Sequence, residues 1–151
     1  MSSRRLLLLV TIVAAGWLTG GAARAVEFMS VSASHAILYD APSSHAKKLF
    51  VVNRYMPFEA VVSLDAWVKV RDRTGALYWI EKSALSFKRY VYVLTPLAEV
   101  RKEPDATSPR VMQVRQHVAL ELLEATGTGW LKVRHQDGEL GYIKHTDVWG
   151  D

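Results

Sequence analysis

Five histidines are the side chains of this sequence best suited to acid–base or metal chemistry near neutral pH: His35, His45, His117, His135 and His145. No two of them have the spacing of a His-x-x-x-His helical pair or of a metal-binding cluster. The chain has no cysteine, which excludes disulfides, thiolate metal ligands and a cysteine nucleophile. It also lacks a Gly-x-Ser-x-Gly segment and a glycine-rich phosphate loop. The sequence therefore predicts no catalytic residues, no metal site and no cofactor.

Aromatic residues at matching positions are the stronger candidates for ligand contacts. Trp67 and Trp130 each open a segment in which apolar and polar residues alternate, as in a strand. Two interpretations are open: each indole covers the core of its own domain, or each forms one wall of a ligand groove. The candidate ligand-binding residues are Tyr39, Trp67, Tyr78, Trp130 and Tyr142.

Tyr78 and Trp79 are neighbours on one predicted strand, so their side chains point to opposite faces of the sheet. One of the two therefore lies outside the core: if Trp79 points inward, like its counterpart Tyr142, then Tyr78 points outward near Tyr39. In that position, Tyr78 belongs either to a ligand groove or to a contact with the other half of the chain. The second half lacks this aromatic pair, so the two halves are not expected to bind a ligand in the same way.

A duplication positions these residues, because the sequence after residue 25 contains one pattern twice. The matching segments are residues 36–42 with 98–104, 50–52 with 112–114, 67–71 (WVKVR) with 130–134 (WLKVR), and 79–80 with 142–143. Both copies are rich in β-branched and aromatic residues, which favours strands. Matches in one order along the chain indicate two domains of the same fold.

Turn residues separate the apolar segments of each copy. Asp137-Gly138 predicts a two-residue hairpin turn, because both residue types tolerate a positive φ. Thr74-Gly75 gives a weaker signal for the same kind of turn in the first copy. Residues 118–126 (VALELLEAT) have no helix cap and match a strand-like segment of the first copy, so we assign them to a strand. Each copy then holds about five short strands. A closed small barrel suits so short a unit, because closure removes exposed strand edges.

Three segments of the second copy carry a family resemblance: residues 100–104 (VRKEP), 129–133 (GWLKV) and 141–143 (GYI). Through them the chain resembles a tandem pair of bacterial SH3-like (SH3b) domains. The first copy departs from the pattern, with Tyr39 in place of the arginine and Tyr78 in place of the glycine. These motifs specify the fold well and the ligand poorly.

The resemblance implies an all-β protein made of two tandem small SH3-like β-barrels, residues 26–86 and 90–151. It implies a non-catalytic module that binds peptidoglycan or a wall-associated ligand through shallow aromatic grooves. The alternative is a periplasmic protein–protein adaptor, or a regulator of an envelope protein. The link at residues 86–89 is short and has no Gly or Pro, so we expect the barrels to lie close together and to share an interface.

Residues 1–25 have the layout of an export signal, with Arg4 and Arg5 before the apolar run 6–18 and a small-x-small site that ends at Ala25. We expect cleavage there and a periplasmic or secreted protein; the alternative is a retained anchor, although a spanning helix needs ~20 apolar residues. Cleavage removes three arginines and no acid, so the net charge falls from +4 to +1. This balance argues against nucleic-acid partners and against stable insertion into a membrane.

Overall fold

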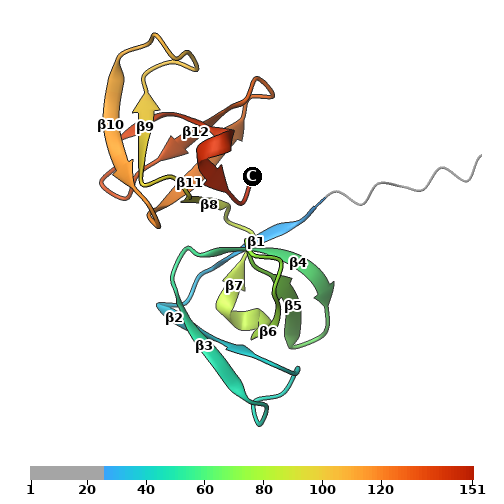
Figure 1. Cartoon of the computed structure of the whole chain (residues 1–151). Helices are drawn as coiled ribbons and strands as arrows, with labels where there is room; N and C mark the ends of the chain where they lie inside the picture. Colours follow the sequence, from blue (N-terminus) through green and yellow to red (C-terminus); the bar gives the residue numbers. More distant parts are fainter. Residues whose placement is uncertain (1–25) are drawn as a thin grey trace, which may run out of the picture.

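Two seven-stranded antiparallel sheets, each curled into a small barrel, make up residues 26–151, the part of the chain that the structure describes (Figure 1). The structure is a computed structural model. The barrels follow one another along the chain and repeat the same strand order, as the duplicated sequence predicts. The predicted export signal, residues 1–25, lies outside the described residues. Within residues 26–151, no helix is long and apolar enough to cross a membrane.

Corresponding strands occupy corresponding places in the two sheets. The first barrel contains β1 (Phe28–Val31), β2 (His35–Tyr39), β3 (Lys48–Asn53), β4 (Pro57–Ser63), β5 (Trp67–Arg71), β6 (Leu77–Glu81), the short 3-10 helix η1 (Lys82–Ala84) and β7 (Leu85–Ser86). The second contains β8 (Tyr90–Val93), β9 (Leu97–Arg101), β10 (Arg110–Arg115), β11 (Ala119–Ala125), β12 (Trp130–Arg134), β13 (Leu140–Lys144), η2 (His145–Asp147) and β14 (Val148–Trp149). The sheet orders are β3-β2-β6-β5-β4-β1-β7 and β10-β9-β13-β12-β11-β8-β14.

The strand assignment of residues 118–126 is confirmed, since β11 covers most of that segment. The expected count of about five strands per copy is too low, because a strand of two residues, such as β7 or β14, is too short to show a period in the sequence. These short strands pair with β1 and β8 and so extend each sheet by one strand.

Apolar side chains alternate along the strands and fill one core in each barrel. In β5, Val68 and Val70 are fully buried, whereas Trp67 lies on the opposite face. Phe58 and Leu120 occupy equivalent positions in the two barrels, and each is 0% exposed. Burying one such side chain contributes roughly 2–3 kcal/mol. The alternation thus decides which side chains of the hairpins remain available to a ligand.

The β12–β13 turn is wider than the two-residue turn predicted at Asp137-Gly138. The Gly138 N–H donates to the His135 carbonyl at 3.0 Å, and the His135 N–H donates to the Glu139 carbonyl at 2.8 Å. Within this turn only Gly138 has a positive φ, of 98°. This is the pattern of a three-residue loop closed by a left-handed glycine. Gly75 has a φ of 89° in the equivalent β5–β6 turn.

Contacts around the short link between β7 and β8 join the two barrels. The ring of Tyr90, at the start of β8, stacks on the ring of Tyr55 with centroids 4.3 Å apart. The backbone N–H of Tyr90 donates to the Oγ atom of Ser30 at 3.3 Å, and Ser30 is only 1% exposed. The barrels therefore share an interface, as the short link predicts.

A second set of contacts in this interface centres on Arg89. Its guanidinium lies 5.2 Å from the centroid of the Phe28 ring and donates from Nη2 to the Gly150 carbonyl at 2.7 Å. Trp149 packs edge-on against Phe28, with centroids 5.3 Å apart. Gly150 has a φ of 111°, and a Cβ atom there would lie 2.9 Å from Cβ of Pro57. Residues from the end of the second barrel are thus packed against the first.

Glu121 on β11 is the centre of a charged bridge beside the same link. Its carboxylate accepts hydrogen bonds from Nε and Nη2 of Arg134, both at 3.1 Å, and lies 3.2 Å from Nζ of Lys88. Hydrogen bonds from Arg134 are the main reason that the pKa of Glu121 lies below its ordinary value, with Lys88 adding to the shift and partial burial opposing it. The bridge therefore stabilises the ionised carboxylate in the folded protein.

We expect Glu121→Gln to lower the free energy of unfolding at neutral pH by about 1 kcal/mol, because it removes the carboxylate from Arg134 and Lys88. A carboxyl group with a lowered pKa stabilises the fold above its unfolded pKa, and that stability is lost as the pH falls through the folded pKa. The difference between wild type and variant should be full above pH 4.5, the ordinary value of this group, and should close below it. Urea unfolding across this range measures it.

Glu103→Gln is the control for this prediction, because Glu103 is an exposed acid outside the bridge. Its unfolding free energy should stay within about 0.5 kcal/mol of wild type at every pH. If the difference caused by Glu121→Gln were as large at about pH 3 as at neutral pH, the bridge would not be its origin.

Candidate functional site

Two of the predicted ligand-binding residues meet on the outer face of the first barrel, Trp67 from β5 and Tyr39 from β2. Trp67 opens β5 and faces outward, because Val68 beside it points into the core. The ring of Tyr39 on β2 meets the Trp67 ring edge-on, with centroids 5.2 Å apart and planes at 90°. Tyr39 is only 5% exposed, so it supports the indole more than it offers surface of its own. The structure therefore brings Tyr39 and Trp67 together at one site.

A groove opens beside these two rings because β2 and β6 separate. The two strands pair only at Tyr39 and Trp79. A hollow of about 260 Å³ lies where they part, and its lining residues are Ala33, His35, Ala36, Ile37, Tyr39, Ile80, Glu81, Ser83 and Ala84. An adjoining hollow of about 470 Å³ is lined by Asp65, Ala66, Trp67, Glu81, Lys82 and Ser83. Together the two hollows form the Trp67 groove.

The Trp67 groove offers three kinds of non-covalent contact. The half-buried indole can stack on an apolar group or on a sugar face with little loss of rotamer entropy. The diverging strands present backbone donors and acceptors, since β2 and β6 share only one pair of residues. Glu81 and His35 add polar side chains at the sides. These groups can bind and orient a ligand.

The second barrel has a groove at the equivalent place, but its chemistry differs. The Trp130 groove has a volume of about 130 Å³ and is lined by Leu97, Glu99, Arg101, Ala106, Trp130, Lys144 and Asp147. Nζ of Lys144 lies 5.9 Å from the Trp130 ring centroid, over its face. At the position of Lys144 the first barrel has Glu81. The face of Trp130 is therefore less available than that of Trp67.

Two charged side chains of the Trp130 groove, Glu99 and Arg101, are paired with each other. Glu99 forms an ion pair with Arg101 and lies 3.2 Å from Nη1 of Arg110. Nη1 of Arg101 donates to the Ser108 carbonyl at 2.9 Å. The hydrogen bond from Arg110 is the main cause that lowers the pKa of Glu99, and Arg101 adds to it, while burial opposes the shift. Glu99 and Arg101 are therefore less available to a ligand than the other two charged side chains of the groove, Lys144 and Asp147.

Tyr142 and Tyr78 lie away from these two grooves. Tyr142 sits on the outer face of β13, opposite Lys132 and Arg101, and is half-buried. Tyr78 pairs with Val70, whose side chain is in the core, and packs against the first core itself. Burial, and secondarily the charge of Asp72, raises the pKa of Tyr78.

The arrangement with Trp79 inward and Tyr78 outward is therefore wrong, and the opposite one is present. Trp79 is on the outer face, where Nζ of Lys69 lies 5.7 Å from its ring centroid, and Tyr78 is on the inner face. Ile80, which is fully buried, fixes this choice, because residues two apart on a strand share a face. Tyr142 corresponds to Trp79 and is likewise outward. Tyr78 contacts Phe50, with ring centroids 5.6 Å apart, at a different cavity between the barrels.

Sequence reasoning missed the apolar surface that accompanies Tyr78. Phe50 and Val51 on β3 are 57% and 68% exposed, although both are large apolar residues. The signal was present in the sequence, because residues 49–52 (LFVV) are apolar without alternation. Such a run places apolar side chains on both faces of the strand, and at the edge of the sheet some on each face stay uncovered.

Among the histidines, His135 contacts an acid of its own turn. Nδ1 of His135 lies 2.9 Å from a carboxylate oxygen of Asp137 within the β12–β13 turn. The hydrogen bond from the Glu139 N–H, followed by the contact with His135, lowers the pKa of Asp137. Across residues 26–151, no group of three or more His, Asp or Glu side chains could hold a metal ion.

Comparison with known proteins supports the two-barrel architecture. The bacterial SH3 domain family matches the chain twice, at residues 32–86 and 95–150. A comparison with curated proteins found no match. Similar solved structures include NlpC2 of Trichomonas vaginalis, with 14% identity and a TM-score of 0.39 over 84% of this chain and 49% of that chain. An NlpC/P60 family protein of Bacillus cereus has 16% identity and a TM-score of 0.38 over 81% of this chain and 55% of its own. The chain thus spans about half the length of these structures.

Proposed function

Because the chain belongs to the bacterial SH3 domain family, we propose that it is an exported, non-catalytic binding module that recognises peptidoglycan or another wall-associated ligand. In this proposal residues 1–25 direct export to the periplasm or the cell exterior and are removed. Residues 26–86 and 90–151 are the two binding units. The family match supports a binding role, and the near-neutral charge of residues 26–151 fits a ligand that is not a polyanion.

The Trp67 groove is the observation that carries this proposal. Its indole is held edge-on by Tyr39, so its orientation is fixed before a ligand arrives. An extended peptide or a glycan strand can lie in a shallow groove of this kind, with one group stacked on the ring and its polar groups on the strand edges. The carboxylate of Glu81 can receive an amino group of a wall peptide. The first barrel is therefore the proposed principal binding unit.

Co-sedimentation with purified peptidoglycan sacculi tests the proposal. We expect the purified protein to pellet with sacculi in a saturable manner, and soluble peptidoglycan fragments to compete with the sacculi. Pelleting no greater than that of an unrelated carrier protein would reject wall binding.

A second candidate function is that of an adaptor or regulator of another envelope protein. The exposed Phe50 and Val51 favour it, because contiguous apolar surface on a small protein commonly marks a protein contact. Crosslinking in intact cells distinguishes this function. It predicts one specific polypeptide attached to the protein, together with no saturable binding to sacculi.

A further inference from the structure

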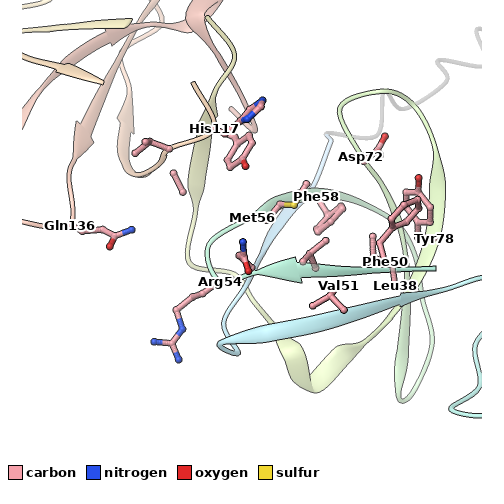
Figure 2. A pocket seen from close by; sticks show the side chains of 15 residues that line it. Leu38, Phe50, Val51, Arg54, Met56, Phe58, Asp72, Tyr78, His117 and Gln136 are labelled. Atoms are coloured by element: carbon pink, nitrogen blue, oxygen red, sulfur yellow. The ribbon is translucent and has the colours of Figure 1, made fainter. Parts of the chain in front are cut away.

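A cavity of about 620 Å³ lies between the two barrels, away from the Trp67 groove. Its floor consists of side chains from the first core, among them Leu38, Met56 and Phe58. His117 and Gln136 of the second barrel line the opposite side, as Figure 2 shows. This interbarrel cleft is therefore lined in part by core side chains of the first barrel.

Strand β3 presents its edge to the interbarrel cleft. Five consecutive residues, 50–54, line the cavity. Successive side chains of a strand point to opposite faces, so a cavity lined by all five lies along the strand's edge and not over one face. β3 is the terminal strand of its sheet and pairs on one side only, with β2. The backbone N–H and C=O groups of its other edge are therefore open to pairing.

The side chains at the centre of β3 leave that part of the edge without polar protection. Phe50 and Val51 project from opposite faces, and both are more than half exposed. The equivalent terminal strand of the second barrel, β10, has Met112 and Gln113 at these positions, and Met112 is half-buried. Soluble proteins usually protect free strand edges with polar or charged residues. The edge of the first barrel lies next to a cavity and has two strongly exposed apolar side chains, whereas its counterpart has Gln113 in place of Val51.

The charge around β3 indicates what kind of chain fits the edge. Residues 47–54 (KKLFVVNR) include Lys47, Lys48 and Arg54 and no acid, and these three basic residues are exposed. Pairing with β3 of a second copy, centred between Phe50 and Val51, would place Lys47 opposite Arg54, so like charges oppose self-association. An acid at each end of an incoming strand would meet a base instead.

Asp72, at the Tyr78 end of the cleft, is the acid among the lining residues. Its Oδ1 atom already accepts hydrogen bonds from the backbone N–H and the hydroxyl of Thr74, at 2.8 Å and 2.6 Å, and from the Ala76 N–H at 3.0 Å. The carboxylate of Asp72 therefore already binds groups of its own turn, residues 72–76. The guanidinium of Arg54, at the other end, donates one hydrogen bond, to Ser34 Oγ at 3.3 Å, and lies 5.9 Å from the centroid of the Tyr55 ring.

We propose that the free edge of β3 in the interbarrel cleft binds a segment of another polypeptide as an added strand, and that this segment is apolar with acidic residues at both ends. Main-chain hydrogen bonds to β3 supply affinity in this mode, and side-chain pockets supply selectivity. One apolar side chain of the segment reaches the floor at Leu38, Met56 and Phe58. The site is separate from the Trp67 groove, and its occupation does not depend on wall binding.

Selection from a random library of displayed peptides of about nine residues, a length that spans β3 and both flanks, tests the proposal. We expect the selected peptides to share a β-branched or aromatic centre with Asp or Glu on either side. Synthetic versions should bind the purified protein in fluorescence anisotropy. N-methylation of alternate backbone amides should weaken binding by at least about tenfold, because it removes the donors that pair with β3.

Val51→Asp and its counterpart Gln113→Asp form a matched pair of variants, because both positions are exposed and both changes add one carboxylate. Val51→Asp should weaken peptide binding by at least about tenfold, and Gln113→Asp should leave it unchanged. Both variants should pellet with sacculi as wild type does. The proposal is wrong if no peptide is enriched over a carrier protein, if the selected peptides lack acidic flanks, or if N-methylated peptides bind equally well. Equal binding by the Val51→Asp variant would also overturn it.

Discussion

Replacement of Trp67 by alanine is expected to remove most of the affinity for sacculi. The indole supplies the stacking surface of the Trp67 groove, and Tyr39 holds it edge-on at 5.2 Å. Loss of a central aromatic anchor typically costs about 2 kcal/mol of binding free energy, which is about thirtyfold in Kd. A binding isotherm from co-sedimentation measures the change. Trp67→Phe keeps an aromatic face and should retain a larger share of the affinity than alanine does.

Trp130→Ala is the matched control for this experiment, because it truncates the same side chain at the same strand position of the second barrel. Lys144 lies over that indole and the neighbouring charges are paired, so we expect the Kd to change by less than about threefold. Circular dichroism should show both variants folded. If Trp130→Ala weakened binding as much as Trp67→Ala, or if neither did, the Trp67 groove would not be the principal site.

Gly141→Ala is expected to have the largest effect on stability. Gly141 lies on β13 beside β9, and a Cβ atom there would sit 2.5 Å from Cγ1 of Val100 and 2.7 Å from the Arg101 carbonyl oxygen. The second contact is with backbone, which cannot move without disturbing the sheet. Overpacking of this kind costs about 1–3 kcal/mol. Urea unfolding followed by circular dichroism measures the loss, and hydrogen exchange at Val133 and Ile143 locates it in the second barrel.

Two variants control this prediction. Leu140→Ala changes an exposed neighbour on the same strand and should cost no more than about 0.5 kcal/mol. Val100→Ala removes the side-chain clash but leaves the Arg101 carbonyl in place, so Gly141→Ala should still destabilise a protein that carries it. Unchanged stability of the Gly141→Ala variant would mean that β9 and β13 can separate at little cost.

The fold could be predicted from the sequence because several independent patterns agree on it. The matching segments around Trp67 and Trp130 define two copies, and the alternation in each gives the strands of the central hairpins. The width of the turn at Gly138 was not predictable from the dipeptide, because Asp at position 137 is compatible with more than one loop length. The strands β7 and β14 were missed, since two residues carry no period.

The candidate site was only partly predictable. Alternation shows that Tyr78 and Trp79 lie on opposite faces, but the choice of face depends on register, and Ile80 in the core decides it. The meeting of Tyr39 with Trp67 depends on how β2 approaches β5 across β6, which a linear pattern does not contain. The interbarrel cleft is formed by residues of both barrels, so its presence depends on how the barrels dock, which the sequence pattern does not contain. The uninterrupted apolar run of β3 is the one sequence feature that indicates exposed apolar surface there.

The junction that holds Arg89 against Phe28 and Tyr90 against Ser30 has a consequence for avidity. Two domains on a slack tether can engage epitopes at many separations, whereas two domains docked face to face cannot. The Trp67 and Trp130 sites are therefore held at one separation and one relative angle. Because the two grooves differ in charge and in exposed aromatic surface, one ligand that reached both would have to present two different groups at that fixed spacing.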